Sequence, residues 1–334
     1  MRRGLAFAAL VTACLALAGG YVGWKVSRES TTSTALSPES IGDLDDGQRI
    51  VFQNVDRDEG YAQVSSVPIT KPDTARMLSG LVCERVHYSN SRGICLVPRR
   101  NVLAASYDAL LLDSALRRRH SVPLPGINSR ARVSPDGRFA AATGFVSGDS
   151  YADHAFSTRT FIIDLERGNV LANLEEFAVY RDGEKIRSID FNYWGVTFAA
   201  DGRFYATLQT RGRTYLVRGD IARRRVDVVH EGVECPSLSP DGKRIAFKKR
   251  TGQTSWRLSV LDLKTLEETP LAETRSVDDQ PEWLNDQEVL YGLETAVWVV
   301  PADGDGEARM LISNALSPAV PRQVASPAQG GAPS

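Results

Sequence analysis

The sequence predicts an all-β fold, a six-bladed β-propeller of four-stranded blades, preceded by an N-terminal membrane-spanning or signal helix. Two observations predict the propeller. A Ser-Pro-Asp-Gly turn motif recurs through the folded region at about one blade length, and short runs of apolar or alternating residues follow each copy, as strands require. A third observation, an uncharged segment after two arginines, predicts the N-terminal helix.

The N-terminal helix is expected within residues 1–26, as a signal anchor or signal peptide. Arg2 and Arg3 precede an uncharged stretch from Gly4 to Trp24, close to the roughly 20 residues that a membrane-spanning helix needs. The positive-inside rule then places the remainder outside the cytoplasm. Three fates stay open: a retained anchor, cleavage after residues 16–18, or lipid attachment at Cys14. We expect a single-pass cell-membrane protein with an extracytoplasmic propeller, or alternatively a secreted or lipid-anchored one.

Two segments have compositions that cannot support a core of their own. Residues 27–47 hold a stretch rich in Ser, Thr and Glu, and residues 319–334 are rich in Pro, Ala, Gly and Ser. We interpret them as a polar tether and a disordered tail. The propeller is therefore expected at residues 48–318.

The repeat itself sets the blades. Residues 134–137 and 239–242 match Ser-Pro-Asp-Gly, and residues 198–205 and 283–291 are degenerate copies. The aspartates of the four copies lie 65, 40 and 45 residues apart; they are Asp136, Asp201, Asp241 and Asp286. A period of 40–45 residues is typical of a four-stranded blade. Pro presets φ, Asp bonds back to the backbone and Gly takes the positive φ, so the motif joins a first strand to a second.

Two weaker blades precede these repeats. Residues 81–124 contain four strand-like runs, and residues 48–81 contain only three, the last of them a poor one near Arg76. The missing strand has two candidates. Residues 315–318 repeat the start of a blade with no blade after them, and residues 35–38 carry the same Ala-Leu-Ser-Pro sequence. We expect closure of the ring by the C-terminal candidate, with the N-terminal one as the alternative.

A disulfide is predicted between Cys83 and Cys95. The two cysteines flank the turn-like segment 89–93 between short apolar runs, so they would face each other across a hairpin. An oxidising exterior permits the bond. The alternative is a pair of buried free thiols.

The turn motif resembles that of the TolB-like propellers, whose WD-repeat-like blades carry Ser-Pro-Asp-Gly between first and second strands. The hairpin of residues 83–96 also resembles exported TolB-like translocation proteins. The resemblance spans residues 48–318 and implies association with the cell envelope and with envelope or membrane proteins as partners. TolB carries a separate α/β domain for which this sequence has no room, so the resemblance predicts architecture better than pathway.

Composition and motifs argue against several function classes. The net charge of −1 predicts no nucleic-acid partner. The sequence has no G-x-S-x-G, H-E-x-x-H, C-x-x-C or phosphate-loop motif, and its four histidines are isolated from one another. Residues 54–60 depart from the spacing of a calcium loop. We therefore expect no catalytic residues, no metal and no cofactor, in a monomeric propeller.

Two functions remain. The first is a protein-binding scaffold in the envelope; the alternative is an exported propeller hydrolase, lyase or carbohydrate-binding protein with a site at the central channel. Converging Asp, Glu and His at the channel mouth would favour the alternative. The third repeat is longer than the others, and its additional residues lie in the segments 147–157 and 177–189. We expect both segments on the face opposite the turn motifs, where loops on a rigid scaffold often carry binding residues. The partner-binding candidates there are Asp149, Tyr151, Asp153, His154, Tyr180, Arg181 and Asp182, followed by Tyr193 and Trp194 at the channel rim.

Overall fold

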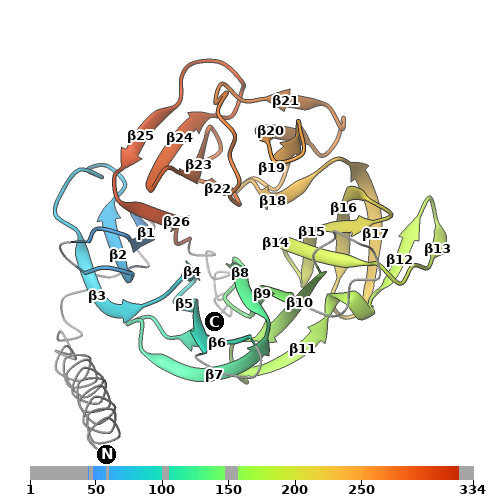
Figure 1. Ribbon diagram of the computed structural model, residues 1–334, viewed down its shortest axis with the longest axis horizontal. Coiled ribbons are helices and arrows are strands. Elements are labelled where there is room, and N and C mark those ends of the chain that lie inside the picture. Colours follow the sequence, from blue (N-terminus) through green and yellow to red (C-terminus); the bar gives the residue numbers. More distant parts are fainter. Residues whose placement is uncertain (1–43, 45–47, 58–59, 100–104, 147–156, 323–334) are drawn as a thin grey trace, which may run out of the picture. The chain divides into compact units, whose positions relative to one another are not determined.

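The computed structural model describes residues 44, 48–57, 60–99, 105–146 and 157–322. The chain divides into two compact units, Met1–Ser37 and Pro38–Ser334, and all described residues belong to the second. They form six sheets arranged in a ring (Figure 1). The predicted all-β, six-bladed propeller is confirmed. The predicted N-terminal helix, the tether except for Leu44, and residues 323–334 of the tail lie outside the described residues.

Each blade is an antiparallel meander that begins at the central axis and ends at the outer rim (Figure 1). The first three blades, each from the inside outward, are β26 (Ala315–Ala319), β1 (Arg49–Asn54), β2 (Gln63–Pro68) and β3 (Met77–Val82); β4 (Arg85–Ser89), β5 (Arg92–Arg99), β6 (Ser106–Leu112) and β7 (Arg118–Pro125); β8 (Ile127–Val133), β9 (Phe139–Val146), β10 (Ser157–Asp164) and β11 (Asn169–Asn173). The last three are β14 (Asn192–Phe198), β15 (Arg203–Thr210), β16 (Arg213–Asp220) and β17 (Arg225–Glu231); β18 (Glu234–Leu238), β19 (Arg244–Arg250), β20 (Trp256–Asp262) and β21 (Glu268–Pro270); β22 (Glu282–Trp283), β23 (Glu288–Leu293), β24 (Ala296–Pro301) and β25 (Arg309–Ile312).

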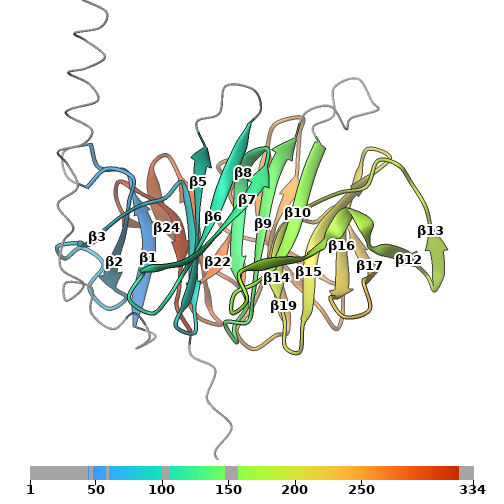
Figure 2. The same cartoon turned by 90° about the horizontal axis from the view of Figure 1, so that it is seen from below.

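The turn motif joins first to second strands, as its chemistry predicts. In residues 239–242 the Ser239 hydroxyl donates to Asp241 Oδ1 at 2.5 Å, and the Gly242 N–H donates to the Ser239 carbonyl at 2.9 Å. Gly242 has φ +72°, the left-handed conformation that glycine adopts without steric cost. Because all these turns follow a first strand, they share one face of the ring, called here the turn face. The opposite face is called the mouth face; strands run between the two (Figure 2).

The hydrophobic core lies between neighbouring blades. Six clusters of buried apolar residues each join residues of one blade to residues of the next, including the pair formed by the last and first blades. For example, Phe204 of the fourth blade packs with Ile162 of the third, and Phe247 of the fifth packs with Leu216 of the fourth. Stability therefore depends on an unbroken ring, since each blade buries its faces only against its neighbours.

The C-terminal strand closes the ring, as predicted. β26 pairs antiparallel with β1, with Ala315 opposite Asn54 and Ala319 opposite Val51. Beyond the strand, the Arg322 carbonyl accepts a bond of 3.0 Å from the Asn90 N–H in the second blade. The C-terminal segment thereby touches both the first and the second blade.

The segment between the third and fourth blades differs from its prediction. Residues 177–189 were expected as a loop on the mouth face, but they form β12 (Ala178–Arg181) and β13 (Glu184–Ile186), after the 3-10 turn η3 (Leu174–Glu176). β12 pairs in parallel with β17, which makes the fourth blade a six-stranded sheet. This hairpin projects outward from the ring (Figure 1). The reason is that Phe177 and Val179 are buried in the same apolar cluster as Phe204 and Val226. This packing holds the segment at the outer edge of the fourth blade.

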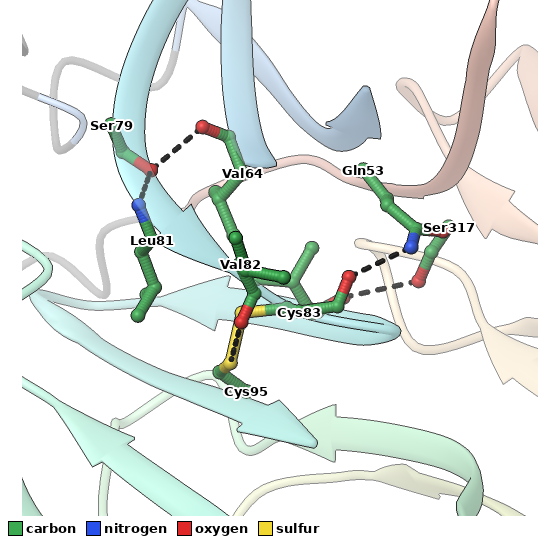
Figure 3. The surroundings of a disulfide bond; sticks show 9 residues. Gln53, Val64, Ser79, Leu81, Val82, Cys83, Cys95 and Ser317 are labelled. Atoms are coloured by element: carbon green, nitrogen blue, oxygen red, sulfur yellow. Dashed lines mark hydrogen bonds between the residues drawn. A yellow bond between two sulfur atoms is a disulfide. The ribbon is translucent and has the colours of Figure 1, made fainter. Parts of the chain in front are cut away.

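The predicted disulfide joins Cys83 and Cys95, with Cα atoms 5.5 Å apart. Cys83 precedes β4 and Cys95 lies within β5, so the bond crosses the hairpin as expected. Both side chains lie in the core between the first and second blades. Figure 3 shows the carbonyl of Cys83 accepting a bond from Gln53 of β1, with Ser317 of β26 close by. Cys235 is free and buried.

In the described part of the chain, no helix has both the length and the apolar composition needed to cross a membrane. The anchor predicted for residues 1–26 lies outside that part, so it stays a prediction.

Candidate functional site

One candidate site is a pocket of about 490 Å³ at the mouth-face end of the central channel, called here the channel-mouth pocket. It is built at the start of the innermost strands, where side chains of five blades or their flanking loops converge. Its lining residues are Arg85, Ile127, Asn128, Ser129, Arg130, Thr143, Phe145, Thr158, Trp194, Glu234, Cys235, Lys248, Arg250, Trp256 and Asp278. A pocket of this size in a rigid ring can hold several side chains of a bound peptide, or a small ligand.

Basic groups outnumber acidic ones in this pocket. Four cationic side chains line it against two carboxylates, those of Glu234 and Asp278. Arg250 Nε donates to Glu234 Oε1 at 2.9 Å, and Lys248 Nζ donates to Asp278 Oδ1. Burial tends to raise the pKa of Asp278, but Lys248 and Arg130 hold it below its ordinary value. Both carboxylates are thus neutralised in ion pairs, and the pocket keeps a net positive charge.

Aromatic and aliphatic side chains form the rim. Ile127 is 60% exposed and Phe145 is 40% exposed, and the two face each other in adjacent strands. Trp256 lies beneath Lys248 and Arg250, whose charged groups stand 4.6 and 4.7 Å from its ring. Its indole N–H donates to Glu234 Oε2 at 3.1 Å. Exposed apolar groups beside cations are typical of surfaces that bind other molecules.

Two buried polar groups in the wall of the pocket lack partners within the described residues. They are the Nδ2 of Asn128, a residue only 9% exposed, and the Nε of Arg130. Buried donors of this kind are costly unless they find an acceptor. They are suited to an oxygen-bearing ligand.

The channel narrows toward the turn face, where a buried ionic cluster fills it. Arg132 Nη1 donates to Glu282 Oε2 and lies 3.1 Å from His87 Nε2, while Arg322 Nη1 lies 3.5 Å from Glu282 Oε1. Burial alone would raise the pKa of Glu282, but Arg132 and His87 lower it to about 2. Burial lowers the pKa of His87. The cavity beside this cluster measures only about 50 Å³.

The distribution of these groups bears on the two functions considered. His87 and Glu282 do converge in the channel, but at its narrow end, and the carboxylate is bound by arginines on both sides. The wide mouth instead presents cations, tryptophans and exposed aliphatic carbons. Among the described residues, no group of three or more His, Cys, Asp or Glu is placed to hold a metal ion. Cationic and aromatic side chains therefore line the wide end of the channel, and His87 and Glu282 lie at its narrow end.

The residues predicted for partner binding separate into three groups. Asp149, Tyr151, Asp153 and His154 lie outside the described residues. Tyr180, Arg181 and Asp182 lie at the outer rim in the β12–β13 hairpin, where Arg225 stacks on Tyr180 at 3.8 Å.

Trp194 lines the channel-mouth pocket. Tyr193 is fully buried in the core between the third and fourth blades, which corrects its placement at the rim. The physical reason is strand alternation, because consecutive side chains of β14 point to opposite sides.

Sequence reasoning did not identify Arg85, Arg130, Lys248 and Arg250 as a cluster. Arg85 lies in β4, Arg130 in β8, and Lys248 and Arg250 both in β19, and only the closed ring brings these three strands together. A signal was available in the innermost strands β4 and β8, where ionisable residues stand on either side of an apolar one at positions 85–87 and 130–132.

Comparisons with known proteins place the fold. No protein-family model matches the sequence, and no curated protein matches it. Among solved structures, TolB from Acinetobacter baumannii superposes with a TM-score of 0.55 at 17% identity, over 85% of this chain and 68% of that one. A putative TolB from Agrobacterium tumefaciens has a TM-score of 0.47 at 13% identity, over 79% of this chain and 87% of that one.

A puromycin-hydrolysing peptidase from Mycobacterium tuberculosis has a TM-score of 0.48 at 14% identity, over 80% of this chain and 43% of that one. At 17% identity, the likeness to TolB from Acinetobacter baumannii shows the fold alone. The chain thus has TolB among its structural neighbours and is itself a six-bladed β-propeller.

Proposed function

We propose that this protein is an exported, envelope-associated propeller that binds a protein partner at its channel-mouth pocket. The observation that carries the proposal is a net-cationic pocket of about 490 Å³ whose rim exposes Ile127 and Phe145. Such a pocket favours a partner segment that combines a carboxylate with apolar or aromatic side chains. The disulfide and the N-terminal sequence support an extracytoplasmic location.

Residues 147–156, which hold four of the predicted binding residues, lie outside the described residues, whereas residues on either side of them are placed. Phe145 before this segment and Thr158 after it both line the pocket. We therefore keep Asp149, Tyr151, Asp153 and His154, together with Trp194, as candidates for the partner surface. The hairpin residues Tyr180, Arg181 and Asp182 belong to a different part of the ring.

Photocrosslinking tests the proposal directly. A photoreactive residue at Ile127 should capture a protein in intact cells, while the same residue at Met310 should not. Met310 is a matched control because it is 55% exposed on β25, the outer strand of the sixth blade. Capture that is equal at both positions, or absent at Ile127, would reject the proposal.

A charge test adds specificity. Phe145→Glu places an anion at the rim and should abolish capture from Ile127 if the partner segment is acidic. Met310→Glu is the control substitution. Retained melting temperature in both variants shows that the ring is intact.

A second candidate is a small-ligand or hydrolytic function at the channel, favoured by the convergence of His87 and Glu282. The same experiment distinguishes it. A small-molecule adduct at Ile127, with no captured protein, would favour this candidate over the first.

A further inference from the structure

A second cavity lies at the outer rim of the fourth blade, far from the channel along the sheet. It has a volume of about 410 Å³ and sits between the β12–β13 hairpin and strands β15 to β17. Its lining residues are Arg181, Ile186, Arg187, Ser188, Phe191, Leu208, Thr210, Arg211, Arg213, Tyr215 and Val228. The inserted hairpin, which accounts for part of the long third repeat, forms one wall of the cavity.

The floor of this rim cavity is apolar. Ile186 comes from the hairpin, Phe191 follows it, and Leu208 and Val228 belong to the sheet. Leu208 is fully buried, while Phe191, Ile186 and Val228 are only partly buried against the core. An apolar surface that stays open in this way gains free energy if a ligand covers it.

Four arginines stand around that floor, and nearby acids neutralise only two of them. Arg213 pairs with Glu231 at 3.2 Å, and Arg181 lies 3.9 Å from Asp182. Arg187 and Arg211 make no ion pair with any residue that the structure describes. Asp190 is nearby and keeps its negative charge, but its carboxylate accepts hydrogen bonds from the Ser188 hydroxyl, from the Thr210 hydroxyl at 2.7 Å and from the Arg211 backbone N–H at 2.6 Å, not from a guanidinium.

Arg211 occupies an unfavourable backbone position. It has φ +49° and precedes Gly212 at φ +73° in the two-residue turn between β15 and β16. Turns of this type strongly prefer Asn, Asp or Gly at the first position. An arginine there costs stability, and it places a guanidinium at the edge of the cavity.

We propose that the rim cavity binds a small amphiphilic anion, a single apolar chain or ring that ends in a carboxylate or phosphate-type group. The apolar body would cover Phe191, Ile186 and Val228, and the anionic group would accept hydrogen bonds from Arg187 and Arg211. Guanidinium groups suit this role because they bind such oxyanions with two parallel donors. The site is separate from the channel-mouth pocket, so the proposal stands independently of the partner-binding function.

Titration calorimetry on the full-length protein tests the ligand class. Dodecanoate should bind, whereas acetate, which lacks the apolar body, and dodecyltrimethylammonium, which has the opposite charge, should not. Vesicles of phosphatidylglycerol present the same combination of an apolar chain and an anionic group, but as part of a membrane. Binding to vesicles without binding of monomeric dodecanoate would overturn the proposal, as would equal binding of the cationic amphiphile.

Variants then locate the site. Arg187→Gln and Arg211→Asn should each weaken dodecanoate binding roughly tenfold, the size of one charge-assisted hydrogen bond. Arg211→Asn should also leave the melting temperature unchanged or raise it, because Asn suits the turn. If Arg211 had only a structural role, Arg211→Asn would not weaken dodecanoate binding while keeping or raising the melting temperature.

Two further variants complete the test. Arg118→Gln with Arg119→Gln removes two exposed arginines from β7 of the second blade and should leave affinity unchanged. Val228→Phe fills the floor and should abolish binding at an unchanged melting temperature. Dodecanoate affinity that falls equally in the Arg118 and Arg119 control would show a non-specific charge effect and overturn the proposal.

Discussion

The side-chain amide of Gln53 donates a hydrogen bond of 2.8 Å to the carbonyl of Cys83. This bond connects β1, which pairs with the C-terminal strand, to the disulfide at the start of the second blade (Figure 3). Ser317 of β26 reaches the same blade, donating to the Val86 carbonyl at 3.3 Å. The covalent link and the closure of the ring therefore reinforce one junction.

Removal of the disulfide should destabilise this junction. We expect Cys83→Ser with Cys95→Ser to lower the free energy of unfolding by about 2–4 kcal/mol, because the loop closed by the bond spans 12 residues. Urea unfolding of oxidised wild type, reduced wild type and the double variant measures the effect. Cys235→Ser is the control for loss of a buried thiol. Equal stability of all forms would show that Gln53 and Ser317 suffice to hold the junction.

Loss of the C-terminal strand should open the ring. A protein that ends at residue 314 lacks β26, so β1 would present an unpaired edge, and such edges promote aggregation. A protein that ends at residue 322 keeps β26 and Arg322 and serves as the control. We expect the shorter form to aggregate or to lose its cooperative melting transition. An unchanged melting temperature would mean that another segment closes the first blade.

The buried ionic cluster at the narrow end of the channel should be sensitive to the loss of one member. Arg132→Met leaves the Glu282 carboxylate beside His87 without its main cation, and breaking a buried pair in this way typically costs about 3–5 kcal/mol. Arg322→Met, which removes a longer and more exposed contact, should cost much less. Thermal unfolding of both variants at neutral pH measures the difference. Equal losses would show that the cluster is not dominated by Arg132.

The fold could be predicted from sequence because its signals are local. Asp241 and Gly242 form a tight turn whose chemistry is complete within six residues, and the spacing of such turns gives the blade length. Ring closure was predicted from residues 315–318 for the same reason. The disulfide was predictable because Cys83 and Cys95 flank one hairpin.

The candidate site could not be predicted in the same way. Arg85, Arg130 and Lys248 lie in three different blades, and only the circular arrangement places them in one pocket. The hairpin at residues 178–186 was expected as a loop, since three- and four-residue strands carry a weak pattern. Its parallel pairing with β17 joins residues that lie 47 positions apart in the chain, such as Val179 and Val226.

Glu175 is a further group whose environment only the fold creates. It lies in η3, partly buried, and the backbone N–H of Thr160 donates to both of its carboxylate oxygens at 3.1 Å. Burial raises the pKa of Glu175 to about 8, and these hydrogen bonds only partly oppose the effect. The folded protein therefore holds a proton on Glu175 at neutral pH, where the unfolded chain would not.

The stability of the propeller should consequently fall as the pH rises. A carboxyl group whose pKa is raised in the folded state contributes stability that is fully present below its unfolded pKa near 4.5 and is lost as the pH approaches 8. We expect wild type to lose on the order of 2 kcal/mol between pH 5 and pH 8 from this group, after allowance for its partial exposure. Glu175→Gln, which stays neutral, should remove this part of the pH dependence, whereas Glu176→Gln at the exposed neighbouring position should not. Urea unfolding of the three proteins at pH 5, 6.5 and 8 measures the slope, and parallel curves for wild type and Glu175→Gln would contradict the assignment.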